Sequence, residues 1–397
     1  MTDPRLHYQQ PLLTTPFHPR TSAASKLNQW GPWAGYTTAL VFDDDVMEYT
    51  AIRNAATVYD LCPMVKYAVT GPDAAAYLNR LTLRNAAKLP VNSVQYTAWT
   101  DDCGKILDDG TLFRLGQSDY RLCCQERHLP WLLDSAIGFD VAVRDVTAAV
   151  AALSLQGPCA WSVLREAGFA AARDLKPFKL AHVPFQGGQV MISRTGFTAD
   201  LGYELWTTPG LALALWDHLF AAGVLYGIRP IGSRALDLAR IEAGFIIANM
   251  DFVPAEQAVR EDRVRSPFEL GLDWMIDWDK GPFTGRRALI GEQAGKTSKW
   301  ALVGLDIAGN VSAAGSLIYA DKKHEVGHIT AAAWSPTTKR NIAIAQVHRS
   351  QQAARNLWVE IYALRELQYH KLMVKATIAE RPFYAPPRRR ATPPGDF

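Results

Sequence analysis

The sequence predicts an α+β fold that ends in a small antiparallel β-barrel or sandwich. At 397 residues the chain is too long for one hydrophobic core, so we expect two or three domains. Strand-like and helical segments alternate up to about residue 292 without the regular β-α-β order of a doubly wound sheet. From residue 298 to 390, six short apolar segments follow one another with turns between them, as in a small barrel or sandwich.

The first elements are expected in this order. Residues 1–32 read as an irregular lead-in, and a helical pattern begins near residue 46. "VKYAVTG" (65–71) alternates like a strand, and "GPDAAAYLNRL" follows as a helix, because Pro72 and Asp73 suit a first helical turn. "VQYTAW" and "KILDDGTLFRL" form a predicted hairpin, with "DYRLCC" as a third strand.

Further helices and strands complete the region 33–292. The predicted helices are "HLPWLLDSAIGF", "CAWSVLREAG", "GLALALWDHLFAAG" and "SRALDLARIEAG". The predicted strands are "AALSLQGP", "GQVMISRTGF" and "LGYELW". The polar, turn-rich "GEQAGKTSK" marks a boundary before the C-terminal strands. The tail "PFYAPPRRRATPPGDF" is Pro-rich and basic, and its last part, residues 391–397, is expected to be disordered.

Composition excludes several classes of function. A net charge of +3 gives no reason to expect nucleic acid or an anionic membrane as partner. Five cysteines without a C-x-x-C pair argue against a disulfide framework or structural zinc and favour a reducing compartment. No apolar run approaches the roughly 18 residues of a membrane span. We expect a cytoplasmic protein, with a transit peptide as the alternative because the first 42 residues carry a single acid.

Two segments resemble known functional motifs, but their sequence context argues against both functions. His324–His328 matches H-E-x-x-H, but a zinc protease needs this motif on a helix, and here Gly327 and the surrounding residues indicate a strand. "GEQAGKT" resembles a phosphate-binding loop but has three rather than four residues between its glycines. No metal site is therefore expected.

An acidic pair interrupts the second strand of the predicted hairpin. Asp108 and Asp109 lie between apolar residues, and successive side chains of a strand point to opposite faces. One carboxylate therefore faces inward or lines a cavity, unless Asp109–Gly110 is a bulge or strand end that leaves both acids solvated. A buried carboxylate costs several kcal/mol unless it is paired, so an inward one points to function.

Read together, blocks along the whole chain resemble the glycine-cleavage T-protein family of folate-dependent aminomethyltransferases. The similarity runs in order from about residue 33 to 390. The blocks are "AIRNAATVYDLCPM", "GPDAAAYLNRL", "QYTAWTDDCGKILDDGTLFRL", "LSLQGPCA", "SRTGFTADLGYEL", "ALDLARIEAG", "SPFELGLDW…GPFTGRRAL" and "GHITAAAWSP…IAIAQV…PFYAPPRR". The resemblance implies a three-domain ring, with residues 33–292 as two intertwined subdomains and tetrahydrofolate in the central channel.

The resemblance also implies which residues bind the folate. Tyr96 and Phe197 match aromatic walls for the flat pterin, and Gln125 matches an Asn that contacts the pterin edge. Glu204 matches a carboxylate that accepts two neighbouring pterin N–H groups, with a surface strand-end Glu as the alternative. Asp109 matches the catalytic aspartate, which would orient the folate amine or move a proton. Asp108 is assigned a structural role on the opposite face.

The anionic glutamyl tail of folate needs a cation. Arg240 matches the family's Arg-x-Glu helix together with Glu242, although both could equally make helix-packing salt bridges. Where the family has an Arg directly before an Asp, this chain has Leu236 before Asp237. Arg234 is the expected substitute, with Arg388 and Arg389 as alternatives.

The substrate side departs from the family. Its Ser-His-Met becomes Cys62–Pro63–Met64, and a tyrosine hydroxyl is missing at Phe197. Trp33, Met64 and Trp99 are candidates for binding a methylated substrate, the two tryptophans as an aromatic cage for a cation, with core packing as the alternative.

These observations favour an enzyme that demethylates a small amine or betaine, sulfonium or aryl methyl ether to give 5-methyl-tetrahydrofolate. The first alternative is the aminomethyltransferase reaction with lipoyl H-protein as partner. The second is a folate-binding scaffold without catalysis. The Lys-Gly-Cys-Tyr-x-Gly-Gln-Glu segment of the family's scaffold branch does not occur here.

Overall fold

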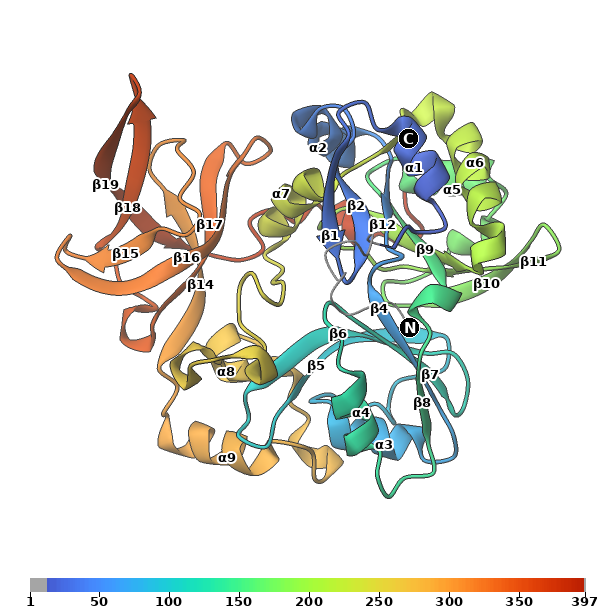
Figure 1. Ribbon diagram of the computed structural model, residues 1–397, viewed down its shortest axis with the longest axis horizontal. Helices are drawn as coiled ribbons and strands as arrows, with labels where there is room; N and C mark the ends of the chain where they lie inside the picture. Colours follow the sequence, from blue (N-terminus) through green and yellow to red (C-terminus); the bar gives the residue numbers. More distant parts are fainter. Residues whose placement is uncertain (1–12, 396–397) are drawn as a thin grey trace, which may run out of the picture.

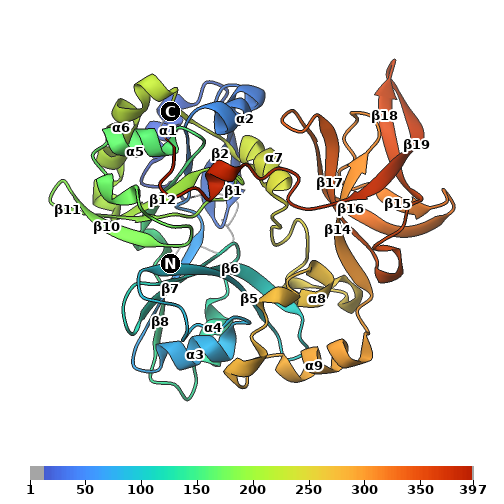
Figure 2. The ribbon, with the colours of Figure 1, turned by 180° about the vertical axis from the view of Figure 1, so that it is seen from behind.

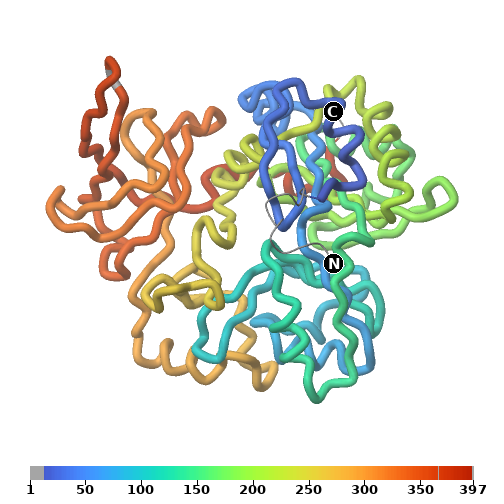
Figure 3. Tube along the Cα trace, in the orientation of Figure 1, coloured from blue at the N-terminus to red at the C-terminus, as the bar shows by residue number. Residues whose placement is uncertain are grey.

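Three parts of the chain surround a common centre in the computed structural model, which describes residues 13–395 (Figures 1 and 3). A β-barrel occupies one side. Two α+β parts occupy the others, and the view from behind shows the same arrangement (Figure 2). This is the predicted α+β ring.

The first sheet carries the acidic pair. Its strand order is β5-β6-β7-β4-β8, and α3 (Ala74–Leu81) and α4 (Leu129–Ser135) cover one face. The strands are β4 (Val65–Thr70), β5 (Ser93–Thr100), β6 (Ile106–Arg114), β7 (Asp119–Cys124) and β8 (Ala142–Asp145). The predicted hairpin is present as β5–β6, where Ala98 pairs with Asp109 and Trp99 with Asp108.

The second sheet has six strands in the order β10-β11-β12-β9-β3-β13. These are β3 (Thr57–Asp60), β9 (Ala151–Gln156), β10 (Leu180–Phe185), β11 (Gly188–Ser193), β12 (Gly202–Thr207) and β13 (Arg229–Pro230). α5 (Ala160–Glu166) and α6 (Ala212–Gly223) share one core with it, and α7 (Ser233–Ala243) packs beside α2 (Asp45–Asn54) in another. The helical stretch Pro209–Tyr226 is long and apolar enough to cross a membrane, but α6 within it buries Leu215, Trp216 and Leu219 in the core.

The C-terminal strands close into a barrel, which decides between the two predicted architectures. Its order is β14-β17-β16-β15-β18-β19. The strands are β14 (Trp300–Ile307), β15 (Leu317–Ala320), β16 (His324–Ser335), β17 (Arg340–His348), β18 (Leu357–Arg365) and β19 (Gln368–Ala379). Closure leaves no free edge. The H-E-x-x-H residues lie in strand β16 and therefore do not share one helical face.

Two helices precede the barrel. α8 (Pro267–Leu270) begins with a capping box formed by Ser266 and Glu269. α9 (Arg286–Gly295) extends into the "GEQAGKT" segment, so the turn-rich boundary expected there begins only at Lys296, which adopts a left-handed conformation (φ 52°).

The described residues near both ends of the chain form more regular structure and contacts than the sequence suggested. Residues 13–32 contain α1 (His18–Ala24) and most of β1 (Gln29–Trp33), which pairs with β2 (Tyr36–Val41). Phe17 is fully buried beside Trp216, so long-range packing overrides weak local signals. In the tail, the carbonyl of Ala391 accepts from Arg194 Nη2 at 3.0 Å. Residues 1–12 and 396–397 lie outside the described part.

Candidate active site

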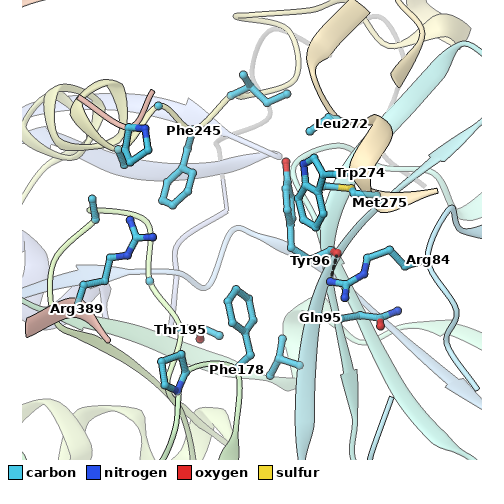
Figure 4. Close-up of a pocket in the computed structure, with 18 of the residues that line it drawn as sticks. Arg84, Gln95, Tyr96, Phe178, Thr195, Phe245, Leu272, Trp274, Met275 and Arg389 are labelled. Carbon is cyan, nitrogen blue, oxygen red and sulfur yellow. Dashed lines mark hydrogen bonds between the residues drawn. The ribbon is translucent and has the colours of Figure 1, made fainter. Parts of the chain in front are cut away.

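A cavity of about 900 Å³ lies beside β5, where both sheets and the C-terminal segment meet. Aromatic side chains from separate segments line it: Tyr96 from β5, Phe178 from the loop before β10, Phe245 after α7, and Trp274 after α8 (Figure 4). The Tyr96 and Trp274 ring centroids are 6.4 Å apart. A cavity with such walls suits a flat, partly apolar ligand.

The same cavity is strongly cationic. Its lining includes Arg84, Lys88, Arg194, Arg381, Arg389 and Arg390. Among the described residues, the acidic side chains lining it are Asp200 and Asp277, and each is already paired. Asp200 binds Arg388 at 2.6 Å and Asp277 binds Lys88 at 3.3 Å. The remaining positive charge favours an anionic ligand.

Asp109 is joined to the cavity wall by Tyr96. The Tyr96 hydroxyl donates to Asp109 Oδ2 at 2.5 Å, and Asp109 is half-buried. Burial, and then the charge of Asp108, raise the pKa of Asp109 to about 8. Burial also raises the pKa of Tyr96, so the tyrosine stays the donor. Asp109 is not itself part of the cavity lining, but it is bonded to Tyr96, which is. A carboxyl with a pKa near neutrality is suited to accept or release a proton.

Asp108 points to the opposite face, as the alternation of a strand requires. It is fully buried and accepts hydrogen bonds from two backbone N–H groups, those of Asp109 (2.8 Å) and Glu126 (3.0 Å). His128 Nε2 lies 3.0 Å from its other side. Neither acid is therefore fully solvated.

The other residues expected to bind the pterin lie on separate segments, and none of them is part of the cavity lining. Glu204, on β12, accepts from the Thr195 hydroxyl at 2.6 Å, and burial raises its pKa to about 7. Phe197 stacks on Phe245, with centroids 5.2 Å apart and planes 21° apart, so it supports the aromatic wall. Gln125 is half-buried just beyond the end of β7.

The expected tail-binding cations are distributed differently from the prediction. Arg240 is fully buried and committed to Asp251 (2.5 Å) and Asp237 (2.7 Å), so its guanidinium does not reach the cavity. Arg234 is exposed at the start of α7 and is not part of the cavity lining. Arg389, one of the alternatives, does line the cavity (Figure 4).

Glu242, the partner of Arg240 in the Arg-x-Glu pattern, is also buried, with Arg53, Tyr49 and Ser335 around its carboxylate. Both residues of the pattern therefore make the packing salt bridges that the sequence left open as the alternative.

The candidate substrate residues do not form a cage in this structure. Trp99 is fully buried with its ring edge-on to His128 at 5.6 Å, which favours the core-packing alternative. Trp33 is half-buried beside Tyr59, and Met64 packs in the same cluster. Neither lines the large cavity, and a substrate role for Trp33 and Met64 stays a prediction.

Sequence reasoning missed several cavity residues. Arg84 lies 5.7 Å from the Trp274 ring centroid and donates to the Tyr96 carbonyl at 3.2 Å (Figure 4). Phe178 and Arg381 come from other segments. None stands in a motif. The available signals pointed to Trp274, which ends the family-like block "SPFELGLDW" and lies in the tryptophan-rich "GLDWMIDW".

Comparisons with known proteins agree with this geometry. Residues 20–280 match the GCVT N-terminal domain, and residues 301–385 match the glycine cleavage T-protein C-terminal barrel domain. The chain is 34% identical over 359 residues to a trimethylamine-oxide aldolase of Ruegeria pomeroyi, a match covering 87% of this chain but only 44% of that longer relative.

An aminomethyltransferase of Caldanaerobacter subterraneus is 30% identical, over 89% of this chain and 91% of the relative. The solved structure of glycine cleavage system aminomethyltransferase T from Bartonella henselae matches with a TM-score of 0.82 at 23% identity. That match covers 94% of this chain and 99% of the other, and it shows a shared fold.

Proposed function

Because this chain belongs to the glycine cleavage T-protein family of folate-dependent transferases, we propose that it moves a one-carbon unit from a small methylated substrate to tetrahydrofolate. The observation that carries the proposal is Asp109, a carboxyl with a raised pKa that is bonded to the cavity-lining Tyr96.

The residues present fit tetrahydrofolate, the one-carbon carrier of the family. Tyr96, Phe178, Phe245 and Trp274 offer flat apolar walls. The cationic lining, Arg389 included, suits the glutamyl carboxylates. Glu204 offers a carboxylate for neighbouring N–H donors.

In the proposed reaction the folate supplies a nucleophilic ring nitrogen. Asp109 takes the proton that this nitrogen releases as the new N–C bond forms, and Tyr96 holds the carboxylate in place through its 2.5 Å hydrogen bond. If the donor is a sulfonium or quaternary ammonium, the electrons of the broken bond stay on the leaving sulfur or nitrogen. Asp109 is then the only proton acceptor that the step requires, and 5-methyl-tetrahydrofolate is the product.

The donor class rests on two supports. The relative from Ruegeria pomeroyi carries the name of an enzyme acting on a methylated amine oxide. The sequence also lacks the imidazole and the tyrosine hydroxyl that the resemblance places where a lipoyl-bound group would approach, at Cys62–Met64 and Phe197. The aminomethyltransferase reaction with lipoyl H-protein remains the second candidate, because relatives with that name match nearly the full chain.

A donor panel tests the proposal. The protein is incubated with tetrahydrofolate and, separately, quaternary amines, betaines, sulfonium compounds, aryl methyl ethers, amine oxides and aminomethyl-loaded H-protein, and the folate products are separated. We expect 5-methyl-tetrahydrofolate from a small donor. Methylene-tetrahydrofolate formed only with H-protein would instead establish the aminomethyltransferase reaction. A folate-induced rise in melting temperature without any turnover would indicate a binding scaffold.

A further inference from the structure

A buried line of three ionisable side chains lies behind Asp109. His128 Nε2 is 3.0 Å from Asp108 Oδ2, and His128 Nδ1 is 2.5 Å from Glu256 Oε1. The side chains of Asp108 and His128 are fully buried, whereas that of Glu256 is 32% exposed. The line therefore runs from the interior of the first sheet to the surface turn Ala255–Gln257.

Asp108 connects this line to Asp109. Its second oxygen, Oδ1, accepts the backbone N–H of Asp109 at 2.8 Å. The two carboxylates lie on opposite faces of β6 and share no proton, so the influence of Asp108 on Asp109 is electrostatic and positional. The charge on Asp108 acts on Asp109 in full only when His128 is neutral.

We propose that His128 is a positioning residue for the transfer reaction, which sets the charge behind Asp109 and responds to Glu256 at the surface. A protonated His128 compensates Asp108 and so favours the Asp109 carboxylate, the form that accepts a proton. This role rests on the proposed function insofar as Asp109 is the proton acceptor.

The surroundings of His128 support a protonated ring. Asp108 on β6 and Glu256 face its two nitrogens, and the hydroxyl of Tyr67 on β4 accepts its backbone N–H at 2.7 Å. From β5 the Trp99 ring contacts it edge-on. The adjacent cation, Arg127, is paired with Asp145 at 2.8 Å.

On β7, Cys124 directs its thiol to the Glu126 carbonyl. Burial lowers the pKa of His128, but the hydrogen bonds and charges of Asp108 and Glu256 outweigh it, and the pKa is raised.

The pKa of Asp109 should shift in opposite directions in two variants, and this distinguishes the proposed role from simple packing. His128→Gln leaves Asp108 uncompensated and should raise the pKa of Asp109. Asp108→Asn removes the anion and should lower it. Glu256→Gln weakens the hold on the His128 proton, so it should shift the pKa of Asp109 in the same direction as His128→Gln, by less. Loss of packing alone has no reason to produce shifts of opposite sign.

The test is a carbon-13 NMR titration of aspartate-labelled full-length protein, with the Asp109 carboxyl signal assigned by its absence in Asp109→Asn. We expect His128→Gln to raise the Asp109 midpoint and Asp108→Asn to lower it, each by about one pH unit, as for one charge lost at close range. His218→Gln is the matched control. His218 is half-buried, and its ring is bonded to the Ala167 carbonyl at 2.8 Å, but it lies in another core, so the Asp109 midpoint should not move.

Unchanged Asp109 midpoints in folded His128→Gln and Glu256→Gln, or shifts of equal sign in His128→Gln and Asp108→Asn, would overturn the proposal. If His128→Gln does not fold, the surface variant Glu256→Gln decides. The titration needs no turnover, so failure of the proposed reaction and failure of this role are separate outcomes. Where the donor panel yields turnover, the acid limb of kcat/KM should move with the midpoint.

Discussion

Replacing Asp109 by Asn should leave folding and folate binding intact and remove transfer. The amide has nearly the same size as the carboxylate. Its oxygen can still accept a hydrogen bond from the Tyr96 hydroxyl, which lies 2.5 Å from Asp109 Oδ2 in the wild type. It cannot accept the proton released as the new bond forms. Because general-base catalysis typically contributes about 10²–10⁴-fold, we expect kcat to fall by about that factor while the dissociation constant of tetrahydrofolate changes little.

The pH profile gives a second, quantitative signature. With a pKa of about 8, about one Asp109 carboxyl in ten is ionised at pH 7. The wild-type rate should therefore rise from pH 6, reach about half of its plateau near pH 8 and level off only above about pH 9, whereas the residual rate of Asp109→Asn should lack this rise. Product formation is measured from pH 6 to 9, with Asp102→Asn, an exposed Asp in the turn of the same hairpin, as the matched control.

The same shift makes a prediction for stability. Folding raises the pKa of Asp109 from 3.8 to about 8, so folding is penalised increasingly as pH rises through this range. After discounting for partial exposure, Asp109→Asn should be more stable than wild type at pH 9 by on the order of 1–3 kcal/mol, and equally stable at pH 4. Urea unfolding at both values measures this. Full activity in Asp109→Asn, or a folded variant that no longer binds folate, would refute the assignment.

Three further predictions follow from the positions of other side chains. Arg389→Gln should weaken tetrahydrofolate binding about tenfold, because it removes about one charged hydrogen bond to the ligand. The binding of a pterin without the glutamyl tail should not change. Calorimetry measures both affinities, with the exposed Arg287→Gln as control. Arg240→Met should destabilise the fold by about 3–5 kcal/mol in urea unfolding because it strands buried Asp251, and adding Asp251→Leu should restore much of the loss. Trp99→Phe should lower the free energy of unfolding by about 1–2 kcal/mol through a small cavity, yet leave the KM of the methyl donor unchanged, because Trp99 is fully buried.

The sequence correctly predicted the elements whose alternation or turn residues can be recognised over a short stretch of chain. The β5–β6 hairpin and the six barrel strands alternate or are bounded by turn residues, and both are present. α1 has only seven residues and β1 contains Gly31 and Pro32, so neither carries a strong signal. Their order depends on long-range contacts, such as that of Phe17 with Trp216.

The site was predictable from local sequence only where a single hairpin carries it. Asp109 and Tyr96 lie on adjacent strands of one hairpin, and the structure joins them. Arg240 looked like an available cation, but Asp251, eleven residues further on, neutralises it. Trp274 and Arg381 reach the cavity from segments far apart in the sequence, and no local rule brings them together.

The presence of two adjacent acids on β6 can be explained by the groups that surround each of its two faces. An apolar residue in place of Asp108 would leave the N–H groups of Asp109 and Glu126 and the ring of His128 without their acceptor. Each such loss costs about 1–3 kcal/mol for a buried group, so an acid is needed there whatever Asp109 does. That acid, one residue from Asp109, necessarily opposes ionisation of the second carboxyl. A histidine on the far side of Asp108 can offset this effect without entering the cavity, and His128 stands in that position.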